Sequence, residues 1–138
     1  MVRRLPAVGS IYYLNAWKNV NKMKQYQIIP LSIPQAGGVL SKQVSVSPES
    51  AKIDGIFIHA PGQYSLDGVT LELRIGGVEI FPRDFEVNLV LTNYFLSQKE
   101  VMYPIDKPAN CDTVEMVLRN KMGVQPHDIN LYLVCTKR

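Results

Sequence analysis

The stretch VTLELRIGGVEIFP, residues 69–82, constrains the fold of this chain more than any other segment. In its first seven residues apolar side chains at the odd positions alternate strictly with Thr, Glu and Arg. Successive side chains of a β-strand point to opposite faces, so the alternation indicates a strand with one face in a core and the other in water. We therefore predict that Leu73 is buried and that Thr70, Glu72 and Arg74 lie on the solvent side.

Gly76 and Gly77 interrupt this alternation. A two-residue type I′ turn needs a positive φ at both central positions, which glycine adopts without strain. The pair therefore predicts a β-hairpin, whose second strand continues with Val78, Ile80 and Pro82 on the core side.

Further strands are predicted at short intervals on both sides of the hairpin. The segments that alternate or are rich in β-branched residues are 26–33, 37–46, 52–60, 101–105, 112–120 and 129–136. Pro30 lacks the N–H that a central strand needs, so 26–33 is expected at a sheet edge. In 52–60 apolar residues occupy both parities, so both faces of this strand should be covered. Residues 84–96 fit both a strand and a helical stripe, and we favour the strand.

Short strands separated by turns, with no dependable helix between them, are typical of antiparallel two-sheet folds. We predict an all-β chain, a single antiparallel β-sandwich or jelly roll of about seven to nine strands over residues 25–138. Residues 1–24 are predicted to form an N-terminal arm or a short helix.

The positive charge is concentrated in this arm. The net charge is +3, yet no acidic residue occurs before residue 25, and the basic ones there are Arg3, Arg4, Lys18, Lys22 and Lys24. Tyr13 and Trp17 fall on a helically spaced apolar stripe, although three asparagines in the same segment equally favour an extended arm that orders on a partner. We predict that these basic and aromatic residues contact nucleic acid or a neighbouring subunit, the alternative being a solvated terminal face.

No residues are arranged in a pattern that predicts catalysis. His59 and Asp54 are five positions apart and point to opposite faces if their strand is regular, and His127 lies in a connector. Cys111 and Cys135 form neither a disulfide scaffold nor a Cys-x-x-Cys motif, and the glycine pairs match no phosphate-binding loop. We therefore expect no catalytic residue, no metal and no cofactor.

The sequence also carries no sign of a membrane or an export segment. No apolar run approaches the roughly 20 residues of a membrane helix, and the first residues lack the apolar core of a secretory signal. We expect no membrane partner and no export by a cleaved signal.

Aromatic residues in segments predicted as loops are a second candidate for binding. Together with one aspartate they are Tyr64, Asp67, Tyr94 and Tyr103. Loop aromatics at the end of a sandwich often contact sugars or protein partners, so this set predicts a carbohydrate- or protein-binding module. The alternative is that these rings pack against the ends of the core.

The tract from Lys52 through VTLELRIGGVEIFPRDF, closed by INLYLVCTKR, resembles in character the small jelly-roll and sandwich proteins of tailed-phage heads. The resemblance extends over most of residues 26–138. It implies a non-enzymatic auxiliary or minor capsid protein of a virus or phage, made in the host cytoplasm and incorporated into the virion. Its implied partners are other virion proteins in many copies or a homo-oligomer, with nucleic acid reached through the arm.

Overall fold

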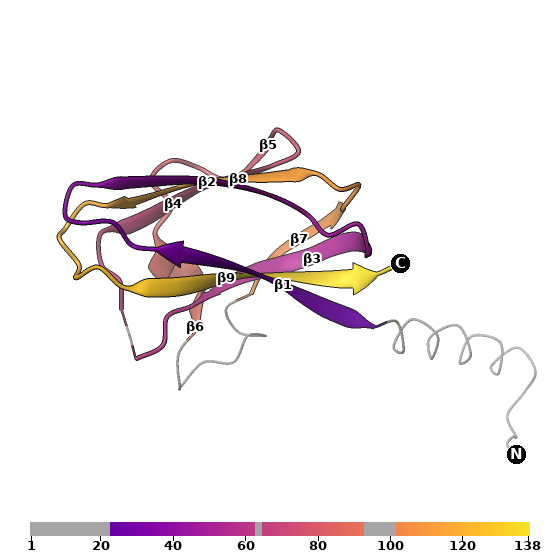
Figure 1. Cartoon of the computed structure of the whole chain (residues 1–138), viewed down its shortest axis with the longest axis horizontal. Coiled ribbons are helices and arrows are strands. Elements are labelled where there is room, and N and C mark those ends of the chain that lie inside the picture. Colours follow the sequence, from indigo (N-terminus) through magenta and orange to yellow (C-terminus); the bar gives the residue numbers. More distant parts are fainter. Residues whose placement is uncertain (1–22, 63–64, 93–101) are drawn as a thin grey trace, which may run out of the picture.

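The computed structural model describes residues 23–62, 65–92 and 102–138 of the chain. These residues form nine strands and one 3-10 turn, and the strands make two sheets that lie face to face (Figure 1). In chain order the elements are β1 (Lys24–Ser32), β2 (Val39–Ser45), β3 (Ser50–His59), β4 (Val69–Ile75), β5 (Val78–Phe81), η1 (Val87–Val90), β6 (Leu91–Thr92), β7 (Tyr103–Pro108), β8 (Thr113–Asn120) and β9 (Asp128–Lys137). The prediction of an all-β sandwich is confirmed.

The two sheets have different strand orders. The five-stranded sheet has the order β1-β9-β3, and the remaining edge of β3 pairs with β7 along its first half and with β6 at its end. The four-stranded sheet has the order β2-β8-β4-β5. Every pairing is antiparallel except that between β3 and β6.

The core fills the space between the sheets and is formed by alternate residues of the strands. Leu73, predicted to be buried, has 0% exposure. The inner residues of β9 are likewise fully buried, namely Ile129, Leu131, Leu133 and Cys135. In β3 adjacent apolar residues are buried on both faces, with Phe57 at 6% and Ile58 at 0%, as its sequence predicted.

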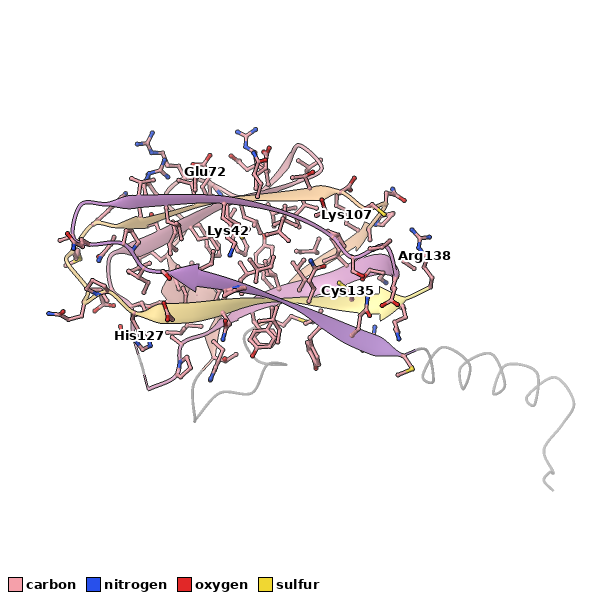
Figure 2. All side chains as sticks on the ribbon, viewed as in Figure 1. Lys42, Glu72, Lys107, His127, Cys135 and Arg138 are labelled. Carbon is pink, nitrogen blue, oxygen red and sulfur yellow. The ribbon has the colours of Figure 1, made fainter. Side chains whose placement is uncertain are left out.

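The open side of the sandwich, between β1 and β2, is closed by polar side chains. Lys42 reaches from β2 toward β1 and donates a hydrogen bond from Nζ to the carbonyl oxygen of Pro30 at 2.7 Å (Figure 2). Gln27 of β1 donates to the Ser45 carbonyl at 2.9 Å and accepts from the Ser47 N–H at 2.8 Å. β1 is therefore an edge strand, as predicted from Pro30, and both the proline and the Lys42 contact reduce its capacity to pair with another strand.

The hairpin between β4 and β5 has the predicted turn. Gly76 and Gly77 have φ of 59° and 80°, the sign that a type I′ turn requires. A Cβ at Gly76 would lie 2.8 Å from the carboxylate of Asp112, whereas one at Gly77 would meet nothing within 4 Å. At Gly76 a side chain is therefore disfavoured both by the positive φ and by close packing, whereas at Gly77 it is disfavoured by the positive φ alone.

The predicted orientation of the second hairpin strand is wrong. Arg74 pairs with Glu79 but Leu73 pairs with Phe81, so a β-bulge at Ile80 adds one residue to β5. The bulge turns Phe81 into the core at 0% exposure, in place of the predicted Ile80 and Pro82.

The prediction of a strand over residues 84–96 is also wrong for most of its described part. Residues 87–90 form the 3-10 turn η1, and only the two residues of β6 are strand. Val87 and Val90 are three apart and both buried, which suits the three-residue period of a 3-10 helix. Asn88 between them accepts a hydrogen bond from the Leu66 N–H at 2.7 Å and so fixes this turn to the preceding loop.

Thr70 differs from its predicted solvent position. It is 3% exposed because the chain at Glu86 pairs with it across the edge of β4. Within the part of the chain that the structure describes, its hydroxyl is buried without a hydrogen-bond partner.

No helix in the described residues is long and apolar enough to cross a bilayer.

Candidate functional site

Three aromatic side chains from separate strands meet on the outer face of the five-stranded sheet. Phe57 of β3 lies opposite Tyr132 of β9, and Tyr26 comes from the adjacent edge strand β1. The rings of Phe57 and Tyr132 are stacked, with centroids 4.8 Å apart and an interplanar angle of 6°. Tyr26 meets both edge-on, at 6.4 and 6.2 Å. These geometries are the favoured ones for aromatic pairs.

This cluster lines a shallow hollow together with His59, the last residue of β3. Ile28 continues the apolar surface along β1, opposite Tyr132. Tyr26 and Ile28 are 48% and 52% exposed. We call these five residues, Tyr26, Ile28, Phe57, His59 and Tyr132, the aromatic face.

His59 is held in one orientation by a contact with Thr92. Its Nδ1 lies 3.2 Å from the hydroxyl oxygen of Thr92, and that hydroxyl donates its own proton to the Ile58 carbonyl at 3.2 Å. Thr92 therefore links the His59 ring to the backbone of β3. The other ring nitrogen, Nε2, donates or accepts a hydrogen bond according to the tautomer.

A charged cluster borders the aromatic face at the start of β1. The Asp54 carboxylate accepts hydrogen bonds from Thr136 at 2.7 Å and from Lys24 at 3.0 Å, and Lys52 lies 3.5 Å away. Lys52 also pairs with Asp106 at 2.7 Å. Burial acts to raise the pKa of Asp54, but the hydrogen bonds from Thr136 and Lys24 and the charges of both lysines outweigh it and lower the pKa.

Asp54 and His59 are expected on opposite faces only if β3 is regular, and β3 is not regular. β3 contains a register shift between Ile53 and Gly55, where Asp54 is the extra residue. Asp54 consequently bonds to Thr136, which is on the same face of β9 as Tyr132. The two side chains share the outer face because the bulge changes the parity of the strand.

The outer face of the four-stranded sheet has a different character. Glu72 lies on this face (Figure 2) and pairs with Arg119 at 3.2 Å. Most side chains on it are polar or charged, among them Ser41, Gln43, Glu72, Arg74, Glu115 and Arg119. The outer face of the four-stranded sheet is therefore mainly polar, whereas the outer face of the five-stranded sheet carries the aromatic cluster.

The predicted arm contacts lie almost entirely outside the described residues. Only Lys24 is described, and it belongs to β1, where it pairs with Asp54. The remaining members of the set lie outside, namely Arg3, Arg4, Tyr13, Trp17, Lys18 and Lys22. The folded part of the chain therefore begins at or before Lys24, and this lysine contributes to the sandwich.

The structure describes two of the four predicted loop contacts, Asp67 and Tyr103. Tyr64 and Tyr94 lie outside the described residues. Asp67 accepts hydrogen bonds from Ser65 of its own loop and from Asn88 of η1, both at 2.8 Å. Tyr103 is the first residue of β7 and meets the rings of Phe81 and Phe85 edge-on, at 4.9 and 6.0 Å. The contacts of Tyr103 favour the alternative that it packs against the core.

The histidine and cysteine side chains form no reactive cluster in the described part. His127 donates from Nε2 to the Pro61 carbonyl at 3.0 Å. Cys111 is exposed, and Cys135 is buried, which raises the pKa of its thiol. Among residues 23–62, 65–92 and 102–138, no three His, Cys, Asp or Glu side chains are grouped to hold a metal ion.

Sequence reasoning missed the aromatic face. Its members come from three strands that are far apart in the chain, and only the register of β1, β9 and β3 brings them together. Comparison with protein-family models, curated proteins and solved structures finds no match to this chain.

Proposed function

We propose that the sandwich is a jelly roll. Apart from the two-residue β6, the sheet orders are β1-β9-β3-β7 and β2-β8-β4-β5. With the eight main strands counted along the chain, these orders become 1-8-3-6 and 2-7-4-5. A jelly roll, built from two Greek keys, has this pattern and is common in viral capsid proteins.

On this basis we infer that the chain is a non-enzymatic structural protein of a virus or phage particle, an auxiliary or minor capsid protein. The strand order is the observation that carries the proposal. The aromatic face supports it, because a cluster of partly exposed aromatic side chains on one sheet is typical of an interaction site. The basic segment before β1 adds a contact for a neighbouring subunit or for nucleic acid. With many copies in one shell, weak contacts of this kind suffice.

The proposal is tested by the mass distribution of the full chain in sedimentation velocity over a wide concentration range. A structural subunit forms larger species of defined size as the concentration rises. A chain shortened to residues 23–138 keeps the Lys24–Asp54 pair, and we expect it to fold but to lose these species. A full chain that stays monomeric throughout, with and without nucleic acid, contradicts the proposal.

The role of the arm charges is separated by a second variant. In this variant Arg3, Arg4, Lys18 and Lys22 are replaced with Gln. Lys24 is kept because it pairs with Asp54 in the sandwich. If the partner is nucleic acid, binding and its salt dependence both fall steeply. If the partner is a protein groove that holds Trp17, assembly tolerates the charge loss and is sensitive to Trp17→Ala.

A second candidate function is a carbohydrate- or protein-binding module. The hollow lined by Tyr26, Phe57, His59 and Tyr132 favours it, since aromatic side chains with a nearby polar group are typical of such sites. Jelly rolls also occur in lectin domains. Saturable, sugar-dependent stabilisation of the full chain, lost in Tyr132→Ser and retained in Tyr103→Ser, would favour this module over the shell protein.

A further inference from the structure

We propose that the aromatic face of one subunit binds residues 11–17, IYYLNAW, from the N-terminal segment of a neighbouring copy. This inference rests on the proposed function as a shell subunit and names the partner of the aromatic face. It starts from the contrast between the two outer faces of the sandwich. The outer face of the four-stranded sheet has paired charges such as Glu72–Arg119, whereas that of the five-stranded sheet has the Phe57–Tyr132 stack at its centre.

The aromatic face defines the chemistry of its occupant. Tyr26 and Ile28 are about half exposed and Tyr132 is partly exposed, whereas Phe57 is only 6% exposed and lies at the base of the hollow. Nε2 of His59 adds a hydrogen-bonding ring nitrogen beside the rings, while Nδ1 contacts Thr92. The lysines at the border of the face are neutralised by Asp54 and Asp106. A matching occupant is aromatic and aliphatic and carries a hydrogen-bond donor.

Residues 11–17 meet each of these requirements. The segment contains two tyrosines, a tryptophan, an isoleucine and a leucine within seven residues. The indole N–H of Trp17 is a donor only, so it can bond to Nε2 of His59 in the tautomer that leaves this nitrogen unprotonated. Lys18 follows directly, and a cation beside aromatic rings is attracted by their faces. A buried tryptophan surrounded by aromatic side chains is a common centre of binding energy at interfaces.

The position of the segment in the chain indicates a neighbouring copy. The 22 residues before Met23 join the sandwich at the first residue of the edge strand β1. A chain that continues β1 in extended form carries Trp17 about 20 Å beyond the end of the sheet, at about 3.3 Å per residue. Docking on its own aromatic face would require the chain to reverse direction between Trp17 and Lys24. In an assembly, a segment that led away from its own sheet in this way would come within reach of the next subunit.

The single tryptophan of the chain provides a direct test. The emission of Trp17 in the full chain is recorded as a function of protein concentration. We expect it to move to shorter wavelength as copies associate, because the indole leaves water for the aromatic face. Tyr132→Ser and Tyr26→Ser should each weaken the association at least tenfold, the scale of a residue at an interface centre. Tyr103→Ser is the matched control, since Tyr103 is 38% exposed but packs on Phe81 and Phe85 elsewhere.

Mixing two variants shows whether the contact is between copies. Tyr132→Ser has an intact Trp17 and a damaged face, and Trp17→Phe has an intact face and no tryptophan. Excess Trp17→Phe should restore the short-wavelength emission of the Tyr132→Ser variant. Each variant is first shown to be folded by its thermal unfolding; if Tyr132→Ser does not fold, Tyr26→Ser, altered at a half-exposed side chain, takes its place.

Three results would overturn the inference. Emission typical of water at all concentrations would mean that Trp17 does not dock. A short-wavelength emission that is independent of concentration and of mixing would assign the face to the chain's own segment. Self-association that is lost in Tyr132→Ser without any change in Trp17 emission would assign the face to a second copy's sheet. If larger species form but Trp17 does not dock, this inference is refuted and the proposed function still stands. If Trp17 docks between copies but no larger species form, the proposed function is refuted and the contact between copies still stands.

Discussion

Asn120, at the end of β8, is expected to be among the side chains most costly to remove, and no sequence motif marks it. It is fully buried, and its amide makes four hydrogen bonds. Nδ2 donates to the carbonyls of Pro34 and Val124, at 3.0 and 2.6 Å. Oδ1 accepts from the N–H groups of Gly123 and Val124, at 3.1 and 3.0 Å. One side chain therefore fixes both the connector before β9 and the turn after β1.

The cost of Asn120→Ala follows from this count. Each internal hydrogen bond contributes about 1 kcal/mol net, so four give about 4 kcal/mol, and partner groups left buried without water would raise the loss. Asn120→Asp keeps the shape but places a carboxylate against two carbonyl oxygens. Its loss should be greatest at neutral pH and smaller in acid, where the protonated carboxyl can donate again.

Urea unfolding followed by far-UV circular dichroism measures both variants, and an unchanged m-value keeps the comparison valid. Asn88→Ala is the matched control: Asn88 also makes three side-chain hydrogen bonds, but at a partly exposed site where water can replace those to Ser65 and Asp67, so it should cost only about 1 kcal/mol. If Asn120→Ala costs no more than Asn88→Ala, the account of the connector is wrong.

Three further predictions concern other side chains. Leu73→Ala should cost about 2–5 kcal/mol because Leu73 is fully buried, while Arg74→Ala on the outer face should stay within about 0.5 kcal/mol; equal losses in urea unfolding would contradict the assigned orientation. Thr70→Val should leave stability unchanged or raise it by up to about 1 kcal/mol, because the buried hydroxyl has no partner within the described chain; a clear loss in the same assay would reveal one. Because the pKa of Asp54 is lowered by folding, its carboxylate stabilises the fold at pH values above the ordinary pKa of 3.8, and this contribution is lost as the pH falls through the folded pKa. Asp54→Asn should therefore flatten the decline of the melting temperature in acid. An unchanged pH profile would contradict a stabilising role of the contacts of Asp54 with Thr136, Lys24 and Lys52.

Local patterns predicted the parts of this fold that depend on neighbouring residues alone. The alternation in β4 placed Leu73 in the core, the glycine pair defined the turn, and Pro30 identified an edge strand. The predictions failed where a bulge adds one residue to a strand and so changes the face to which its side chains point, or where a packing contact buries a residue on the outer face. The bulges at Ile80 and Asp54 each reversed a predicted orientation, and the segment at Glu86 buried Thr70.

The candidate site depends on long-range register and was therefore not visible in the sequence. Phe57 and Tyr132 are 75 positions apart and become a stacked pair only when β3 and β9 align. The apolar residues on both parities of residues 52–60 indicated that the outer side of β3 is covered. They did not indicate by which side chains, since nothing near Tyr26 or Tyr132 in the sequence relates them to Phe57.

We propose that this chain is a structural component of a virus particle. This proposal is tested most directly by quantitative peptide mass spectrometry across a density gradient of particles purified from the organism that produces the chain. The account predicts that peptides of this chain sediment with the particles, in many copies per particle and in constant ratio to the other shell proteins. Peptides confined to fractions without particles would contradict it.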